Sequence, residues 1–358
     1  MDNSIVISTP PHVKSKRTTR SIMLDVCFAL APAAIAGCVF FGWQALLIIL
    51  MSVFACVASE FVYFFIANKG FSEKCKNAKA VCLRWTKQFD FTSVVTGLIL
   101  AMIIPTTDKW YQVLYEVIFG AVFAIAIVKM LFGGTGKNLV NPAAAGRVFM
   151  ALSFTHLVAT SGFVGANFGP ISDSSLVFTD ATNLAGLLTN GLDIAPSSYL
   201  SPLDLLLGTG VSGCIGETCK LAIIIGYVYL CIRGVIKWWQ PLLFLVVLGF
   251  TAVLLAGFTF DKYTFDIALF LPSVLSGGAL FGAVFMMPDY VTSPKGVWGQ
   301  LLYYVAGAIL LALLRHFTRM EVISFVILLM NLVTPLIDKY LIRRPFGYIR
   351  QRKHKEGK

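Results

Sequence analysis

The segment QALLIILMSVFACVASEFVYFFIA, residues 44–67, decides the class of protein to which this chain belongs. It is 24 residues long and contains one charged side chain, Glu60. An α-helix rises about 1.5 Å per residue, so a helix of this length crosses the roughly 30 Å of hydrocarbon in a bilayer. Polarity does not alternate along the segment, as it would in a strand of a membrane barrel. The segment therefore predicts a transmembrane helix.

The rest of the chain has the same apolar character. Hydrophobic residues make up 57% of the 358 residues and charged residues 13%, whereas soluble proteins are about 45–50% apolar and about 25% charged. We expect an all-α polytopic membrane protein of about ten transmembrane helices, with a polar segment at 1–21, a transmembrane region at 22–338 and a basic tail at 339–358. The apolar spans lie at residues 22–42, 44–67, 91–106, 111–131, 140–158, 203–232, 239–258, 264–287, 297–315 and 321–338.

The lysines and arginines predict how the chain is oriented. The formal net charge is +11, but the cations gather in short polar segments between apolar spans, which is typical of topology signals and not of nucleic-acid binding. With a cytoplasmic N-terminus, the cytoplasmic segments hold 23 of the 29 lysines and arginines. We therefore expect both termini in the cytoplasm and an outer loop at about residues 159–217. The opposite side holds five cations, namely Lys109, Lys220, Lys262, Arg315 and Arg319.

Two stretches resemble each other and suggest an internal repeat. They are LFGGTGKNLVNPAAAGRVFMA, residues 131–151, and LSGGALFGAVFMMPDYVTSP, residues 275–294. Each has a Gly-Gly pair, small residues, a Phe-Met step and a proline. Ten spans would give two halves of five, an odd number, so the repeat would be inverted across the membrane, as in transporters whose broken helices meet at the midplane. Small residues also permit close helix packing without any repeat, and both interpretations stay open.

Charged side chains inside the spans are costly and are therefore candidates for function. Arg147, which follows Asn141 and Pro142, is a candidate for binding an anionic group or pairing with a carboxylate. For Asp25, Glu116 and Asp266 we favour a structural role at the membrane interface, and the same reading is open for the others. The candidates for coupling to a cation are Glu60, Asp90, Glu217 and Asp289.

Glycine pairs and triplets predict breaks in the helices. They lie at residues 133–136, 208–210 and 277–278. Backbone can leave a helix at membrane depth only where protein or water satisfies it, and glycine lets a ligand approach the main chain closely. No strand precedes these glycines, and no phosphate loop, zinc motif or catalytic triad is present. The cysteines lack C-x-x-C spacing, so we expect no metal site. Because no catalytic motif is present, we also expect no catalytic residue.

The stretch Thr179-Asp180-Ala181-Thr182-Asn183-Leu184-Ala185 carries a resemblance to a known family. It resembles the S/T-G-A-T-P-L-A flavinylation motif found in the D subunit of the Rnf complex and in the B subunit of the sodium-translocating NADH:quinone oxidoreductase. It departs from that motif at Asp180 and Asn183. The length of 358 residues suits the Rnf protein better. Residues 8–33, 133–149, 202–226 and 277–303 are also similar to segments of this family.

The resemblance implies a flavoprotein. In the family, a separate FMN transferase esterifies the last threonine of the motif to the phosphate of FMN. This threonine corresponds here to Thr182, with Thr179, Asp180 and Ala181 beside it. A second, non-covalent flavin such as riboflavin is also implied. We expect it near residues 133–147 or 277–289, with Gly133, Gly134, Asn141 and Arg147 as binding residues.

The resemblance also implies a place in a complex of the bacterial plasma membrane. Electrons would pass between ferredoxin and NAD, coupled to Na⁺ or H⁺ transport. The expected partners are the other FMN-bearing and iron–sulfur subunits and membrane lipid, with no nucleic acid. Alternative interpretations are the quinone-reductase homologue, a non-redox channel like a urea transporter, and a structural anchor. Thr182 would then be a loop or helix-capping hydroxyl.

Overall fold

The described part of the chain is helical throughout. The computed structural model describes residues 17–68, 75–106, 110–154, 202–208, 213–259, 267–318 and 322–341, and these residues contain no strand. The stretch that resembles the flavinylation motif, with Thr179, Asp180, Ala181 and Thr182, lies outside the described residues, as do Asp266 and both chain ends.

Six helices among the described residues are long and apolar enough to cross a membrane. Because their lengths match the roughly 30 Å of hydrocarbon, the prediction of a helical membrane protein is confirmed. These helices are α1 (Thr19–Phe41), α2 (Trp43–Ala67), α5 (Trp110–Val122) with its π-helical continuation η1 (Phe123–Met130), α11 (Trp239–Thr259), α14 (Val297–Thr318) and α15 (Ile323–Leu341).

The other four predicted spans form shorter helices. Span 91–106 contains α4 (Thr92–Met102), and span 140–158 contains α6 (Pro142–Ser153). Span 203–232 contains α9 (Pro202–Leu207) and α10 (Lys220–Ile232). Span 264–287 contains η4 (Ile267–Leu269), α12 (Phe270–Leu275), α13 (Ala279–Phe281) and the π-helix η5 (Gly282–Met286). None of these helices is long enough to cross the bilayer alone, so ten crossings and an inverted repeat stay predictions.

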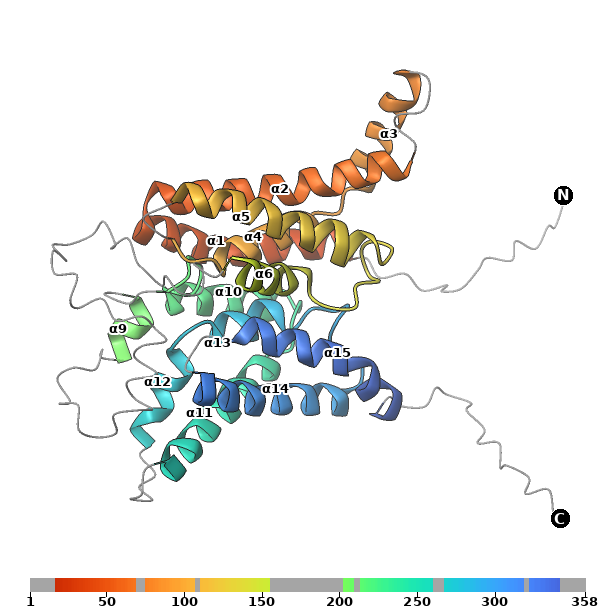
Figure 1. Ribbon diagram of the computed structural model, residues 1–358. Coiled ribbons are helices and arrows are strands. Elements are labelled where there is room, and N and C mark those ends of the chain that lie inside the picture. Colours follow the sequence, from red (N-terminus) through yellow and green to blue (C-terminus); the bar gives the residue numbers. More distant parts are fainter. Residues whose placement is uncertain are drawn as a thin grey trace, which may run out of the picture.

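The helices before residue 154 form one group and those after residue 201 form a second, and the two groups lie side by side (Figure 1). In the first group α2 packs on α4 and α5, and in the second α11 packs on α14. The groups meet where α1 packs on α10 and where α6 packs on α15. Outside both groups, α3 (Cys75–Gln88) extends beyond one end of α2.

Small residues set the closest approaches between helices. Gly226 of α10 lies so near α1 that a Cβ atom there would be 2.3 Å from the Ala29 carbonyl oxygen. Gly97 of α4 lies against α2, where a Cβ atom would be 2.7 Å from the Val53 Cα. Small residues let helices pack closely inside a membrane, where apolar lipid provides no hydrophobic drive for their association.

Several of the cations that were predicted to be cytoplasmic lie together at one end of the helices. The Arg17 guanidinium donates to the Arg233 carbonyl at 2.6 Å. Arg233 in turn forms an ion pair with Asp25 at 3.0 Å, so Asp25 has the structural role expected for it. At the same end Lys237 donates to Gln300 at 2.8 Å.

Two of the cations assigned to the opposite side are buried. Lys220 Nζ donates to the carbonyls of Glu217 and Gly277. Arg315 donates to the carbonyls of Ser273 at 3.1 Å and Ser276 at 3.2 Å. The break between α12 and α13 leaves carbonyls without helical partners, and these two side chains satisfy them. Both side chains therefore have a structural role.

Candidate functional site

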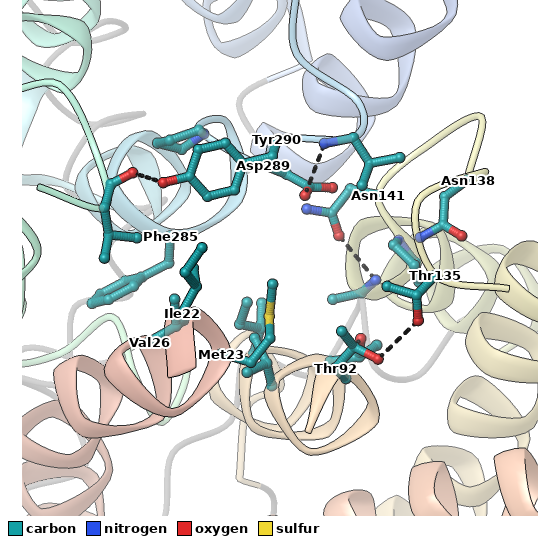
Figure 2. Close-up of a pocket in the computed structure, with 18 of the residues that line it drawn as sticks. Ile22, Met23, Val26, Thr92, Thr135, Asn138, Asn141, Phe285, Asp289 and Tyr290 are labelled. Carbon is teal, nitrogen blue, oxygen red and sulfur yellow. Dashed lines mark hydrogen bonds between the residues drawn. The ribbon is translucent and has the colours of Figure 1, made fainter. Parts of the chain in front are cut away.

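A cavity of about 120 Å³ lies where α1, α4, α6 and η5 meet (Figure 2). Its lining takes residues from both of the similar stretches, 131–151 and 275–294. Thr135, Gly136 and Tyr290 are exposed, so the mouth of the cavity lies between them. A cavity of this size accommodates about one aromatic ring.

The walls of the cavity differ in polarity. Ile22, Met23 and Val26 of α1 form an apolar wall. Figure 2 shows Thr135, Asn138 and Asn141 on the other side. An apolar pocket with a few polar groups on one side suits a planar organic ligand with polar edges.

Asn141 holds the polar wall in place. Its Oδ1 accepts hydrogen bonds from the amides of Ala143 at 3.0 Å and Ala144 at 3.3 Å, which caps the start of α6. Pro142 follows at the first helical position, where the missing amide proton costs nothing. The Asn141 Nδ2 donates to the Met286 carbonyl at 3.1 Å. One side chain therefore fixes α6 to η5.

Two further polar groups are available to a ligand. Asp289 lines the cavity, and its carboxylate accepts from the Val291 amide at 3.3 Å and the Thr292 hydroxyl at 3.1 Å. It lies in the connection after η5, and burial raises the pKa of its carboxyl group, although both hydrogen bonds lower it. The Oδ1 of Asn138 is buried and has no hydrogen-bond partner among the described residues.

A buried ion pair adjoins the cavity. Lys129, which lines the cavity and is 1% exposed, forms a 3.3 Å ion pair with Glu60. Its ammonium also donates to the hydroxyls of Thr92 and Ser93. Asp90 accepts from the Thr92 hydroxyl at 2.6 Å. Two of the four predicted ion-coupling residues, Glu60 and Asp90, are thus connected through Lys129 and Thr92.

The local backbone explains how Lys129 reaches this position. It lies in the last turn of η1, where the Leu131 amide bonds the Ala126 carbonyl five residues earlier. Gly133 and Gly134 follow with φ of 106° and 86°, a region that glycine adopts without strain. The two glycines do not line the cavity, but their turn leads the chain to Thr135.

The remaining predicted site residues lie elsewhere. Glu217 is buried beside the break between α12 and α13, where a Cβ atom on Gly278 would be 2.2 Å from the Glu217 Oε1. Arg147 lies in α6 and does not line the cavity. Its Nη1 is buried without a hydrogen-bond partner among the described residues, where no carboxylate pairs with it.

Sequence reasoning missed Lys129, Thr92 and Asn138 as site residues. Lys129 was counted with the cytoplasmic cations because the apolar span 111–131 ends next to it. A signal was present, since a carboxylate such as Glu60 inside an apolar span needs a buried cation or hydrogen-bond donor.

Known proteins resemble the chain over nearly its whole length. Residues 6–347 match the model of the NQR2, RnfD, RnfE family. The chain is 34% identical over 353 residues to the D subunit of the Na⁺-translocating ferredoxin:NAD⁺ oxidoreductase complex of Acetobacterium woodii, covering 98% of both chains. It is 32% identical over 351 residues to the D subunit of the proton-translocating ferredoxin:NAD⁺ oxidoreductase complex of Clostridium ljungdahlii, covering 96% of this chain and 97% of the relative.

Proposed function

Because this chain belongs to the NQR2, RnfD, RnfE family, we propose that it is the flavin-carrying membrane subunit of an Rnf-type ion-translocating ferredoxin:NAD oxidoreductase. The similarity to the D subunits of two such complexes along nearly the full chain supports this function. The chain would be a subunit of a membrane oxidoreductase and would not be catalytic alone. Its partners would be the other FMN-bearing and iron–sulfur subunits.

The observation that carries the flavin assignment is the motif Thr179–Ala185. A phosphoester between FMN and a protein needs only a hydroxyl from the protein, and Thr182 supplies it. The FMN transferase performs the attachment, with Thr179, Asp180 and Ala181 as the adjoining residues. The bound flavin supplies electron transfer, whereas the protein positions it and adjusts its environment.

We assign the second flavin, of the riboflavin type, to the cavity. The apolar wall from α1 suits the face of a flavin ring, and the side chains of Asn138, Asn141 and Asp289 suit its polar edge. The buried Asn138 Oδ1 provides an acceptor that no described residue uses. Because the cavity accommodates about one ring, side chains at its mouth must move when a three-ring flavin binds.

Ion coupling would use the carboxylates around the cavity. A flavin that takes up electrons gains negative charge, and in a medium of low dielectric constant a nearby cation compensates that charge strongly. Asp289 lines the cavity directly. Glu60 and Asp90 do not line it, but they are bonded to the lining residues Lys129 and Thr92 respectively. Glu217 lies at the other break and would serve a separate step. Unchanged Na⁺ or H⁺ transport per electron in all four single Asn or Gln variants would exclude this coupling.

The orientation follows from the charges. We place the protein in the bacterial plasma membrane, with both termini in the cytoplasm and the flavin-bearing loop, about residues 159–217, on the outer side. The gathering of Arg17, Arg233 and Lys237 at one end of the helices supports this orientation, because cytoplasmic loops are enriched in such residues.

A fluorescence assay on denatured protein tests the function. The full chain is co-expressed with an FMN transferase, and the gel is viewed under ultraviolet light for wild type, Thr182→Val and the control Thr189→Val, which lies in the same loop outside the motif. We expect fluorescence in the wild type and the control and none in Thr182→Val. A dark wild-type band, with the transferase active on another substrate, would exclude covalent flavin and favour the channel or anchor alternatives.

A further inference from the structure

The Lys129 side chain lies between a carboxylate and the cavity. Its ammonium is 3.3 Å from Glu60 Oε1 and 3.2 Å from the Ser93 hydroxyl, and the residue lines the cavity. Thr92, which accepts from the same ammonium, also lines the cavity. A positive charge is therefore held at the wall of the proposed flavin site.

Packing alone does not explain this arrangement. Replacing a buried ion pair by apolar residues is often neutral or stabilising, because desolvation offsets the attraction. Lysine and glutamate inside a membrane are rare, and where they occur they usually belong to pathways for ions, protons or charged substrates. In addition, the π-helical turn of η1 carries Lys129, and such turns occur frequently at functional sites.

We propose that Lys129 sets the reduction potential of the flavin in the cavity and that Glu60 opposes it by sharing the same ammonium. This inference rests on the second flavin site proposed above. Uptake of two electrons from reduced redox centres of the complex, which are thereby oxidised, and of one proton from water leaves a flavin ring with one negative charge. The Lys129 ammonium supplies the positive charge that stabilises that anion.

Glu60 then has the opposite effect on the potential. Its carboxylate lies within ion-pair distance of Lys129 and neutralises part of the ammonium's field at the cavity. Removing the charge of Lys129 should lower the potential, and removing the charge of Glu60 should raise it. A structural role for the pair predicts no such opposite signs, because loss of either partner would only destabilise the fold.

Spectroelectrochemical titration of the non-covalent flavin tests this proposal. The full chain is purified in the Thr182→Val background, so that flavin absorbance comes from added riboflavin retained by the protein. In Lys129→Gln we expect the equilibrium constant for two-electron reduction to fall at least tenfold, which is about 30 mV. In Glu60→Gln we expect it to rise. Lys129→Arg should stay near the background value, as should the control Lys339→Gln, which neutralises an exposed cation on α15.

The outcomes separate the inference from its premise. If riboflavin is retained but neither Lys129→Gln nor Glu60→Gln shifts the potential, Lys129 has no such role and the cavity site stands. If no variant or background protein retains riboflavin, the cavity site is wrong and the inference fails with it, whereas the gel assay for Thr182 is unaffected. If Lys129→Gln does not fold, the absence of a rise in Glu60→Gln overturns the proposal.

Discussion

Asn141 shows how much one residue can decide in this molecule. Its amide oxygen caps α6, and its amide nitrogen bonds the Met286 carbonyl in the second group of helices. Both functions require the Asn side chain, since aspartate provides the acceptor but not the donor. The residue therefore supports stability and the shape of the cavity together.

Replacing Asn141 should separate these two functions. We expect Asn141→Ala to lower the stability by about 2 kcal/mol, because a helix cap and a buried hydrogen bond are both lost. Asn141→Asp should retain part of the helix cap and therefore lose less stability than Asn141→Ala. Thermal unfolding in detergent measures both, with Asn138→Ala as control, since the Oδ1 of Asn138 has no partner among the described residues. Equal losses at Asn141 and Asn138 would contradict this account.

Asp289 should make the stability depend on pH. Burial raises the pKa of its carboxyl group above the ordinary value of 3.8, so in the range between these pKa values the folded state binds more protons than the unfolded state. Stability then falls as pH rises through the folded-state pKa. As pH rises from about 4, the unfolding temperature of wild type should fall relative to that of Asp289→Asn, until the pH exceeds the folded-state pKa. A constant difference between the two proteins would show that Asp289 does not titrate in this way.

At the residue scale, the sequence could identify Glu60 but not its partner. A carboxylate in a 24-residue apolar span is costly wherever it points. Lys129 lies 69 residues further along the chain, and which helix face it occupies depends on the π-helical turn of η1. Hydrophobicity carries no information about that turn, so the ion pair could not be predicted.

Among the elements, the contact between α1 and α10 joins the two groups of helices. Gly226 permits it, because its missing side chain leaves room for the Ala29 carbonyl. The six long helices could be predicted because each is a continuous apolar run. The short lengths of α4, α6 and α10 could not, because hydrophobicity reports composition and not where backbone hydrogen bonding stops.

Filling the space at Gly226 should force the two helices apart. A Cβ atom would lie 2.3 Å from the Ala29 oxygen and 3.0 Å from the Phe285 ring, and overpacking of this kind costs about 1–3 kcal/mol or more. Thermal unfolding of Gly226→Val should show this loss. Val228→Ala on the exposed face of α10 is the control and should change the stability by at most about 0.5 kcal/mol. A Gly226→Val protein as stable as the control would mean that α1 and α10 do not pack closely.

For the whole molecule, several of the cations that were predicted to be cytoplasmic lie at the same end of the helices. Arg17 before α1, Arg233 after α10 and Lys237 before α11 lie at one end. The sequence could predict this gathering because loop cations follow a membrane-wide rule. It could not predict that Lys220 and Arg315 are buried, because the rule assumes that cations beside apolar spans lie in loops.

The orientation can be tested on intact cells. In a protein whose eight cysteines are replaced by serine, single cysteines are introduced by Thr189→Cys in the proposed outer loop and Lys339→Cys in α15. A membrane-impermeant maleimide should label the first in intact cells and the second only after permeabilisation. The reverse pattern would invert the proposed topology, and labelling of both sites in intact cells would exclude it.

The buried cations at the break between α12 and α13 bear on how the chain enters the membrane during synthesis. α10 has 13 residues and is about 20 Å long, too short to cross the bilayer alone. Its first residue, Lys220, bonds the Gly277 carbonyl, which the ribosome adds 57 residues later. Until then the elements that cover α10 are α1, made much earlier, and the short helix α9 just before it. We therefore expect the second half to integrate as one unit beside a first half already in place, so that a chain stalled between α10 and α12 would be a target for membrane quality control.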